Sequence, residues 1–69
     1  MQDTTRSWHG EDLAAIRRAA GLRQTDIADR LGVARSRIAH LEGSRAVTVG
    51  AARRYIDAVT DLRAVVAAR

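Results

Sequence analysis

Residues 24–42 read QTDIADRLGVARSRIAHLE and carry the pattern that decides the fold. With residue 24 counted as the first position, seven places fit two short helices joined by a tight turn. Such a pair needs a small residue where the helices touch, a residue free to take positive φ in the turn, and large apolar residues facing inward. The matching residues are Ile27, Ala28, Leu31, Gly32, Val33, Ile38 and Leu41. Seven constraints in one frame are hard to obtain by chance, so the sequence predicts a helix-turn-helix.

Periodic segments on either side extend this to an all-α prediction. Residues 10–21 repeat apolar side chains at helical spacing and end on a glycine. Residues 48–60 show the same helical spacing and begin with Thr48, a natural N-cap. The second of these helices places Ala52, Tyr55, Ile56 and Val59 on its apolar side. The tail, residues 61–69, fits a helix or a strand, because its Val-Val pair suits both. We expect residues 1–7 to be a flexible N-terminus of a single domain.

Composition indicates the class of partner. The 69 residues contain twelve arginines and no lysine, with a net charge of +4. Seven arginines lie between residues 23 and 54, against three acidic residues, Asp26, Asp29 and Glu42. Guanidinium groups suit phosphates and guanine edges, so a polyanion is a plausible partner, although genome base composition explains the lack of lysine equally well. The excess of arginine is therefore informative mainly through its placement.

Several classes of function find little support. The chain has no cysteine, two histidines far apart in sequence, and no glycine-rich phosphate loop, so we expect no metal, no cofactor and no enzymatic activity. No apolar run approaches the ~18 residues of a membrane span, and the polar start does not suit a signal peptide. We therefore expect a cytoplasmic protein without a membrane partner.

Residues 13–43, LAAIRRAAGLRQTDIADRLGVARSRIAHLEG, resemble the Cro/CI-type, or XRE-like, family of small repressors. The likeness extends over about residues 13–60 and includes an arginine in the first helix, Gly-Leu-x-Gln before the second, and Ile-x-x-Leu-Glu ending the third. The resemblance implies a compact, lambda-repressor-like bundle of about five helices that binds operator DNA as a homodimer. It also implies a partly buried structural ion pair between Arg17 and Glu42.

The second helix of the motif is the expected recognition helix, because its N-terminal part enters the major groove in this type of protein. A helical wheel turns Ser36, Ala39 and His40 away from the core and puts Arg35 and Arg37 beside the exposed first turn. Arginine suits guanine O6 and N7, serine several base edges, and an alanine methyl the thymine methyl. We expect these five residues to read bases, with a phosphate contact as the alternative for Arg37.

Four residues are expected to contact the DNA backbone. Arg23 and Gln24 stand at the start of the first motif helix, where backbone N–H groups also point at phosphate. Ser44 and Arg45 lie in the loop after the recognition helix. The family usually has Ser or Thr before both motif helices, whereas this chain has Arg23 and Ala34, so each helix start lacks that cap.

Two functions remain open from the sequence. The first is a sequence-specific regulator of transcription that binds double-stranded operator DNA. We expect it to be a repressor that acts by occupying a promoter or by contacting polymerase. The second is a protein-interaction module, such as an antitoxin whose tail docks a toxin, with DNA binding secondary. Leu62, Val65 and Val66 are the expected dimer or partner residues, because the other predicted helices need them least. The alternative is that they fold back on the core as a fifth helix.

Overall fold

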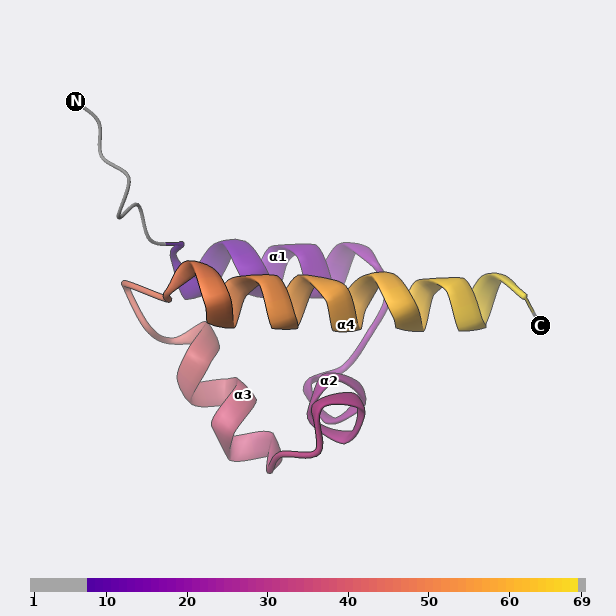
Figure 1. The fold of residues 1–69 in the computed structure, drawn as a ribbon, viewed down its shortest axis with the longest axis horizontal. Helices are drawn as coiled ribbons and strands as arrows, with labels where there is room; N and C mark the ends of the chain where they lie inside the picture. The colour runs from indigo at the N-terminus through magenta and orange to yellow at the C-terminus, as the bar shows by residue number, and fades with distance from the viewer. Residues whose placement is uncertain (1–7, 69) are drawn as a thin grey trace.

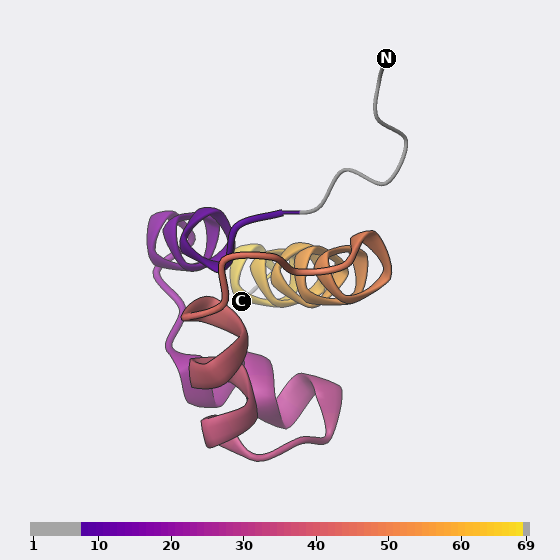
Figure 2. The same cartoon turned by 90° about the vertical axis from the view of Figure 1, so that its left-hand side faces the viewer.

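The computed structural model describes residues 8–68 and arranges them as two layers of helices. The helices are α1 (Gly10–Ala19), α2 (Gln24–Leu31), α3 (Arg35–Glu42) and α4 (Val49–Ala67). Helices α1 and α4 lie side by side and run in the same direction, and α2 and α3 form the other layer (Figures 1 and 2). The N-terminal residues 1–7, expected to be flexible, lie outside the described residues. No described helix combines the length and the apolar character needed to cross a membrane.

The all-α prediction is confirmed, but the number of helices is corrected. The described residues form four helices instead of about five, because residues 61–67 continue α4 without a break. Residues 61–67 are therefore helical, and they form no separate helix that folds back on the core, although Leu62 packs against it. Neither glycine nor proline occurs between residues 51 and 67, and Val66 continues the helical spacing of Tyr55, Val59 and Leu62, so nothing in the chain ends the helix earlier.

Helices α2 and α3 form the predicted helix-turn-helix, with the predicted bounds. Gly32 has a φ of 70°, the positive value that the turn requires, and the N–H of Val33 donates to the carbonyl of Ala28 at 3.0 Å. Ile27, Ala28 and Ile38 are buried in the core. Leu31, Val33 and Leu41 are partly buried and pack against it.

The starts of the helices differ in how they are capped. As expected, neither Arg23 before α2 nor Ala34 before α3 provides a side-chain cap. At α2 the Asp26 carboxylate compensates by accepting from the backbone N–H of Arg23 at 2.8 Å. Thr48 caps α4 as predicted, since its hydroxyl accepts from the N–H of Ala51 at 3.1 Å. Helix α3 is left without any comparable cap.

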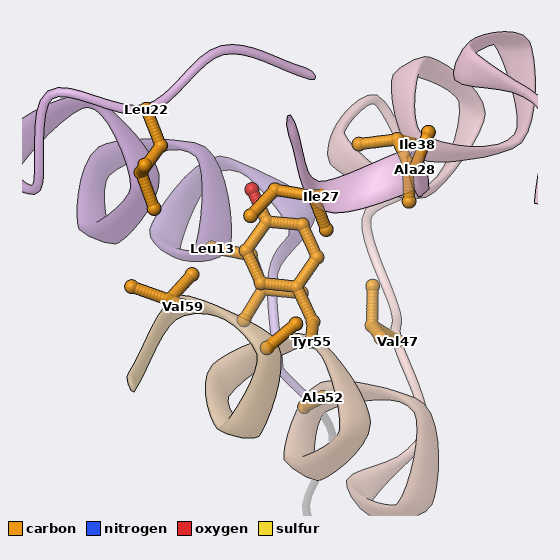
Figure 3. Packing of buried hydrophobic residues seen from close by; sticks show 10 residues of the cluster. Leu13, Leu22, Ile27, Ala28, Ile38, Val47, Ala52, Tyr55 and Val59 are labelled. Carbon is orange, nitrogen blue, oxygen red and sulfur yellow. The ribbon is translucent and has the colours of Figure 1, made fainter. Parts of the chain in front are cut away.

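The ring of Tyr55 lies at the centre of the core (Figure 3). Leu13 from α1, Ile27 from α2 and Ala52 from α4 surround it, and Tyr55, Leu13, Ile27 and Ile38 are the largest fully buried side chains. The predicted apolar side of residues 48–60 therefore does face inward. The hydroxyl of Tyr55, however, has a polar partner that the spacing alone does not indicate.

That partner is the carboxylate of Glu42, the last residue of α3. Its Oε2 accepts from Arg17 Nε at 2.7 Å and from the Tyr55 hydroxyl at 2.5 Å, and its Oε1 accepts from Arg17 Nη2 at 3.1 Å and from Gln24 Nε2 at 3.0 Å. The remaining Arg17 nitrogen, Nη1, donates to the carbonyl of Leu22 at 2.9 Å. One buried carboxylate thus has four donors, which come from α1, α2 and α4.

Two pKa shifts follow from this network. Burial alone would raise the pKa of Glu42, but the hydrogen bonds from Arg17, Tyr55 and Gln24 outweigh burial and lower it. The stabilisation from Glu42 is therefore complete above its ordinary pKa of 4.5 and is lost as the pH falls through the lower folded value. Burial first, and then the bond to Glu42, raises the pKa of Tyr55 above its ordinary value.

A close approach of two backbones sets how α1 begins. The N–H of Gly10 donates to the carbonyl of Ser44 at 2.8 Å, and the backbones of Trp8 and Val47 pair as an isolated antiparallel bridge. A Cβ on Gly10 would lie 2.6 Å from the carbonyl carbon of Glu42 and closer still to the carbonyl oxygens of α3. Only glycine fits where α1 starts against the end of α3.

The two helical glycines should respond oppositely to alanine. We expect Gly10→Ala to lower the free energy of unfolding by about 1–3 kcal/mol, because backbone has to move to make room for the methyl group. Gly50→Ala is the matched control: no atom lies within 4 Å of a Cβ there, and alanine in a helix gains about 0.5–1 kcal/mol. Urea unfolding followed by circular dichroism measures both. A neutral or stabilising Gly10→Ala would contradict the close approach.

The chain contains a single tyrosine, so ultraviolet titration of its phenol reports Tyr55 alone. We expect the phenol to titrate at higher pH in the folded protein than in denaturant, where its pKa returns to about 10. Because the folded pKa is the higher one, the stabilisation is complete below pH ~10 and is lost as the pH rises through the folded value. Tyr55→Phe should lack this alkaline loss of stability. Equal titration in folded and denatured protein would contradict the bond to Glu42.

Candidate nucleic-acid interface

The solvent side of α3 carries four of the five residues expected to read bases. Ile38 and Glu42 bury the other side of the helix. Arg35, Ser36 and His40 are exposed, and Ala39 is half-buried beside them. The C-terminal end of α3 packs against α1 and α4, but its N-terminal end points away from them, so this side of the helix is open to a large partner (Figure 1). The structure thus brings these four residues into one surface.

Arg37 lies on the other flank of α3. It lines a groove between the motif and α4, whose floor is formed by apolar residues from both and whose other basic residue is Arg54. The apolar lining consists of Leu31, Val33, Ile38, Leu41 and Ala51. Residues 35 and 37 are about 200° apart around a helix, which explains why their side chains separate. This position suits the alternative of a phosphate contact for Arg37 better than base reading.

Arg35 does not project freely from α3. Its Nη1 donates to the side-chain oxygen Oε1 of Gln24 at 2.7 Å, which connects the first residue of α3 to the first residue of α2. Gln24, half-buried, is the same residue that donates to Glu42. A residue expected to contact phosphate therefore touches one expected to read a base, and this contact was not predictable from the spacing of the residues.

The other residues expected to contact the DNA backbone differ in whether their side chains already have partners within the protein. Arg23 forms an exposed ion pair with Asp26 at 3.5 Å. The Ser44 hydroxyl donates to the carbonyl of Ala46 at 3.1 Å and accepts from the N–H of Ala46 at 3.3 Å, so it shapes the loop. Arg45 is exposed in the same loop. Of the loop residues, Arg45 is the one available to an anion.

The ion pairs divide the arginines of residues 8–68 into two groups along the chain. The four that precede α3 are paired: Arg17 with Glu42, Arg18 with Glu11, Arg23 with Asp26, and Arg30 with Asp61. The described arginines from α3 onward, by contrast, form no ion pair within these residues. They are Arg35, Arg37, Arg45, Arg53, Arg54 and Arg63, and all are exposed.

The positions of the acidic residues agree with this division of the arginines. Between residues 35 and 56 the only carboxylate is that of Glu42, and it is buried. The exposed surface of α3, the following loop and the first two turns of α4 is therefore purely cationic. Arg53 and Arg54 belong to it, although the sequence pattern alone did not mark them as contact residues. They directly follow the first turn of α4, and the chain has no acidic residue between Gly43 and Ile56, which is the signal that could have found them.

The proposed dimer or partner residues lie at the opposite end of the molecule. The C-terminal turns of α4 extend past the end of α1, away from α3 (Figure 1). Leu62 is partly buried and packs against the core, whereas Val65 and Val66 are 57% and 51% exposed. Val66 falls on the same stripe of α4 as Tyr55 and Val59, so the apolar side of this helix continues beyond the helices that cover it.

Comparison with known proteins agrees with this geometry. A sequence profile described as "Helix-turn-helix domain" matches residues 9–68, which is most of the chain. A search of curated proteins and a search of solved structures each found no match. The matched range includes all four helices, the turn at Gly32 and the cationic surface of α3. The chain belongs to the helix-turn-helix domain family of DNA-binding proteins.

Proposed function

We propose that this protein is a sequence-specific regulator of transcription that represses by occupying a palindromic operator as a homodimer, with α3 in the major groove. In this proposal Arg35, Ser36, Ala39 and His40 meet base edges, and Arg37, Arg45 and the start of α2 meet phosphates. The protein acts in the cytoplasm and performs no catalysis. This assignment is of the Cro/CI type, in keeping with the resemblance of residues 13–60.

One observation carries the proposal: within residues 35–56, from α3 to the first two turns of α4, every exposed charged side chain is cationic. The arginines of α3 form no ion pair within residues 8–68, whereas the four described arginines that precede α3 each form one, and packing of α3 against the core does not account for this difference. Unpaired guanidinium groups beside an open helix face match the two needs of specific DNA binding, which are phosphate neutralisation and base contact.

The homodimer is proposed from the apolar end of α4. One recognition helix spans a few base pairs, whereas two-fold pairing puts two helices into successive major grooves ~34 Å apart. Two exposed valines on a continuing apolar stripe provide a self-complementary surface away from α3. Leu62 would contribute its exposed part to the same contact.

A second function is favoured by the same end of α4. If these valines dock a different protein, such as a toxin or a polymerase subunit, the chain is an interaction module or an antitoxin whose DNA binding is secondary. The oligomeric state of the isolated protein separates the two cases, because a module for another protein has no need to pair with itself.

Operator binding should be both sequence-specific and sensitive to salt. Duplexes selected from a randomised pool should share a palindromic site, and log K for that site should fall with log salt with a slope of about 0.9 per phosphate contact. Arg35→Ala should cost about 1–3 kcal/mol and relax the preference at one base pair, whereas Arg45→Ala should weaken all duplexes alike.

Fluorescence anisotropy with the selected site and a scrambled duplex measures these effects, and circular dichroism checks that each variant is folded. Affinity that does not depend on salt, or that is equal for all duplexes, would contradict the regulator. A uniform loss from both substitutions would show that Arg35 acts only through its charge.

Charges introduced at the exposed valines should separate the protomers. We expect the double variant Val65→Asp, Val66→Asp to sediment as a folded monomer and to bind the operator weakly, because two carboxylates cannot be buried together in an apolar contact. The double variant Thr60→Asp, Ala64→Asp is the matched control, since it adds the same charge to exposed positions on the opposite side of α4. A wild-type protein that sediments as a monomer and binds the operator no more tightly than the Val65→Asp, Val66→Asp variant would contradict the homodimer.

A further inference from the structure

The amide of Gln24 joins two groups with opposite hydrogen-bonding needs. Its Nε2 donates to Glu42 Oε1 at 3.0 Å, and its Oε1 accepts from Arg35 Nη1 at 2.7 Å. A carboxylate only accepts, and a guanidinium only donates. A side chain that connects them must therefore have a donor at one corner and an acceptor at the other, which the amide of glutamine supplies.

This chemistry fixes which way the amide faces. If the amide were turned over, its oxygen would lie against the carboxylate of Glu42 and its NH2 against the guanidinium of Arg35. Both hydrogen bonds would be lost and two repulsive contacts would replace them. Gln24 therefore points its NH2 group inward and its carbonyl oxygen outward, toward the recognition helix.

The inner end of this connection is held by several buried hydrogen bonds. Glu42 is held through both oxygens by Arg17 and through Oε2 by Tyr55, and the ion pair of Glu42 with Arg17 is buried. Gln24 thus links a buried, multiply hydrogen-bonded carboxylate to a side chain on the surface. Among the five residues expected to read bases, Arg35 is the one whose side chain forms a hydrogen bond to another side chain within residues 8–68.

The hydrogen bond leaves Arg35 able to read a base. Only one of its five N–H groups points at Gln24, so the guanidinium keeps enough donors for a paired contact with guanine O6 and N7. Such a contact depends on the plane of the guanidinium, and an anchored plane loses less freedom on binding than a free one.

We infer that Gln24 is a positioning residue for specificity: Glu42 sets the polarity of its amide, and the outward carbonyl oxygen holds the Arg35 guanidinium in the plane in which it reads guanine. This inference rests on the proposed function and goes beyond the phosphate contact expected of Gln24. It makes base preference at one position depend on a residue that does not itself touch the base.

The first test needs no DNA. In 15N NMR spectra of the free protein, the Arg35 guanidinium should show restricted rotation, which Gln24→Met should release while keeping the length of the side chain. Arg23→Met is the matched control, because Arg23 adjoins Gln24 but contacts Asp26 instead. It should leave the Arg35 signals unchanged. An Arg35 guanidinium that is equally mobile in wild type and Gln24→Met would overturn the anchoring.

The second test measures discrimination between guanine and adenine at the base pair that Arg35 reads. We expect Gln24→Met to reduce this discrimination by at least about threefold, and to reduce it no further when Arg35 is already methionine. Arg23→Met should lower affinity for all duplexes alike. A loss from Gln24→Met that is uniform over all sequences would show a phosphate contact alone and would overturn the inference.

The two tests keep the inference separate from the function on which it rests. If Arg35 is anchored in the free protein but no duplex is preferred, the proposed regulator function is contradicted. The proposed role of Gln24 in specificity is then contradicted as well, although the hydrogen bond between Gln24 and Arg35 is confirmed. If an operator is bound specifically but Gln24→Met discriminates as well as wild type, the inference alone fails. Urea unfolding of each variant identifies any general loss of structure.

Discussion

The carboxylate of Glu42 is the interaction on which the rest of the structure depends. It is buried at the end of α3, and its four hydrogen bonds come from Arg17, Gln24 and Tyr55, one residue from each of the other helices. A buried charge with a missing partner is costly, about 3–5 kcal/mol when one member of an ion pair is removed. In a domain with so small a core, this requirement fixes the relative placement of all four helices more strictly than apolar contact alone can do.

The recognition helix is therefore held from its C-terminal end. Ile38 and Glu42 are its buried residues, and no side chain caps its start. Gln24 compensates by reaching from the buried carboxylate to the first residue of α3. The stability of the core and the arrangement of the proposed DNA-facing surface are thus parts of one hydrogen-bonded system.

Much of the fold could be predicted because it follows from spacing and from backbone conformation. The turn at Gly32 and the burial of Ile27, Ala28 and Ile38 follow from periodicity and positive φ, and the Thr48 cap follows from its place before an apolar repeat. The role of the Tyr55 hydroxyl could not be predicted, because an aromatic at an apolar position shows nothing of its polar end. The Gln24–Arg35 bond joins residues eleven apart in the chain and depends on how the two helices cross. The length of α4 was ambiguous, since valine suits strand and helix alike.

The separation of paired and unpaired arginines also gives the molecule an orientation in an electric field. Within residues 8–68, ion pairs neutralise the arginines of α1 and α2 but not those of α3, the loop or the start of α4, so uncompensated positive charge is concentrated on the side of α3. Near a polyanion such a body experiences a torque before any contact forms. The protein would thus meet DNA with α3 leading, and a larger share of its collisions would occur in an orientation from which it can slide and sample sequence.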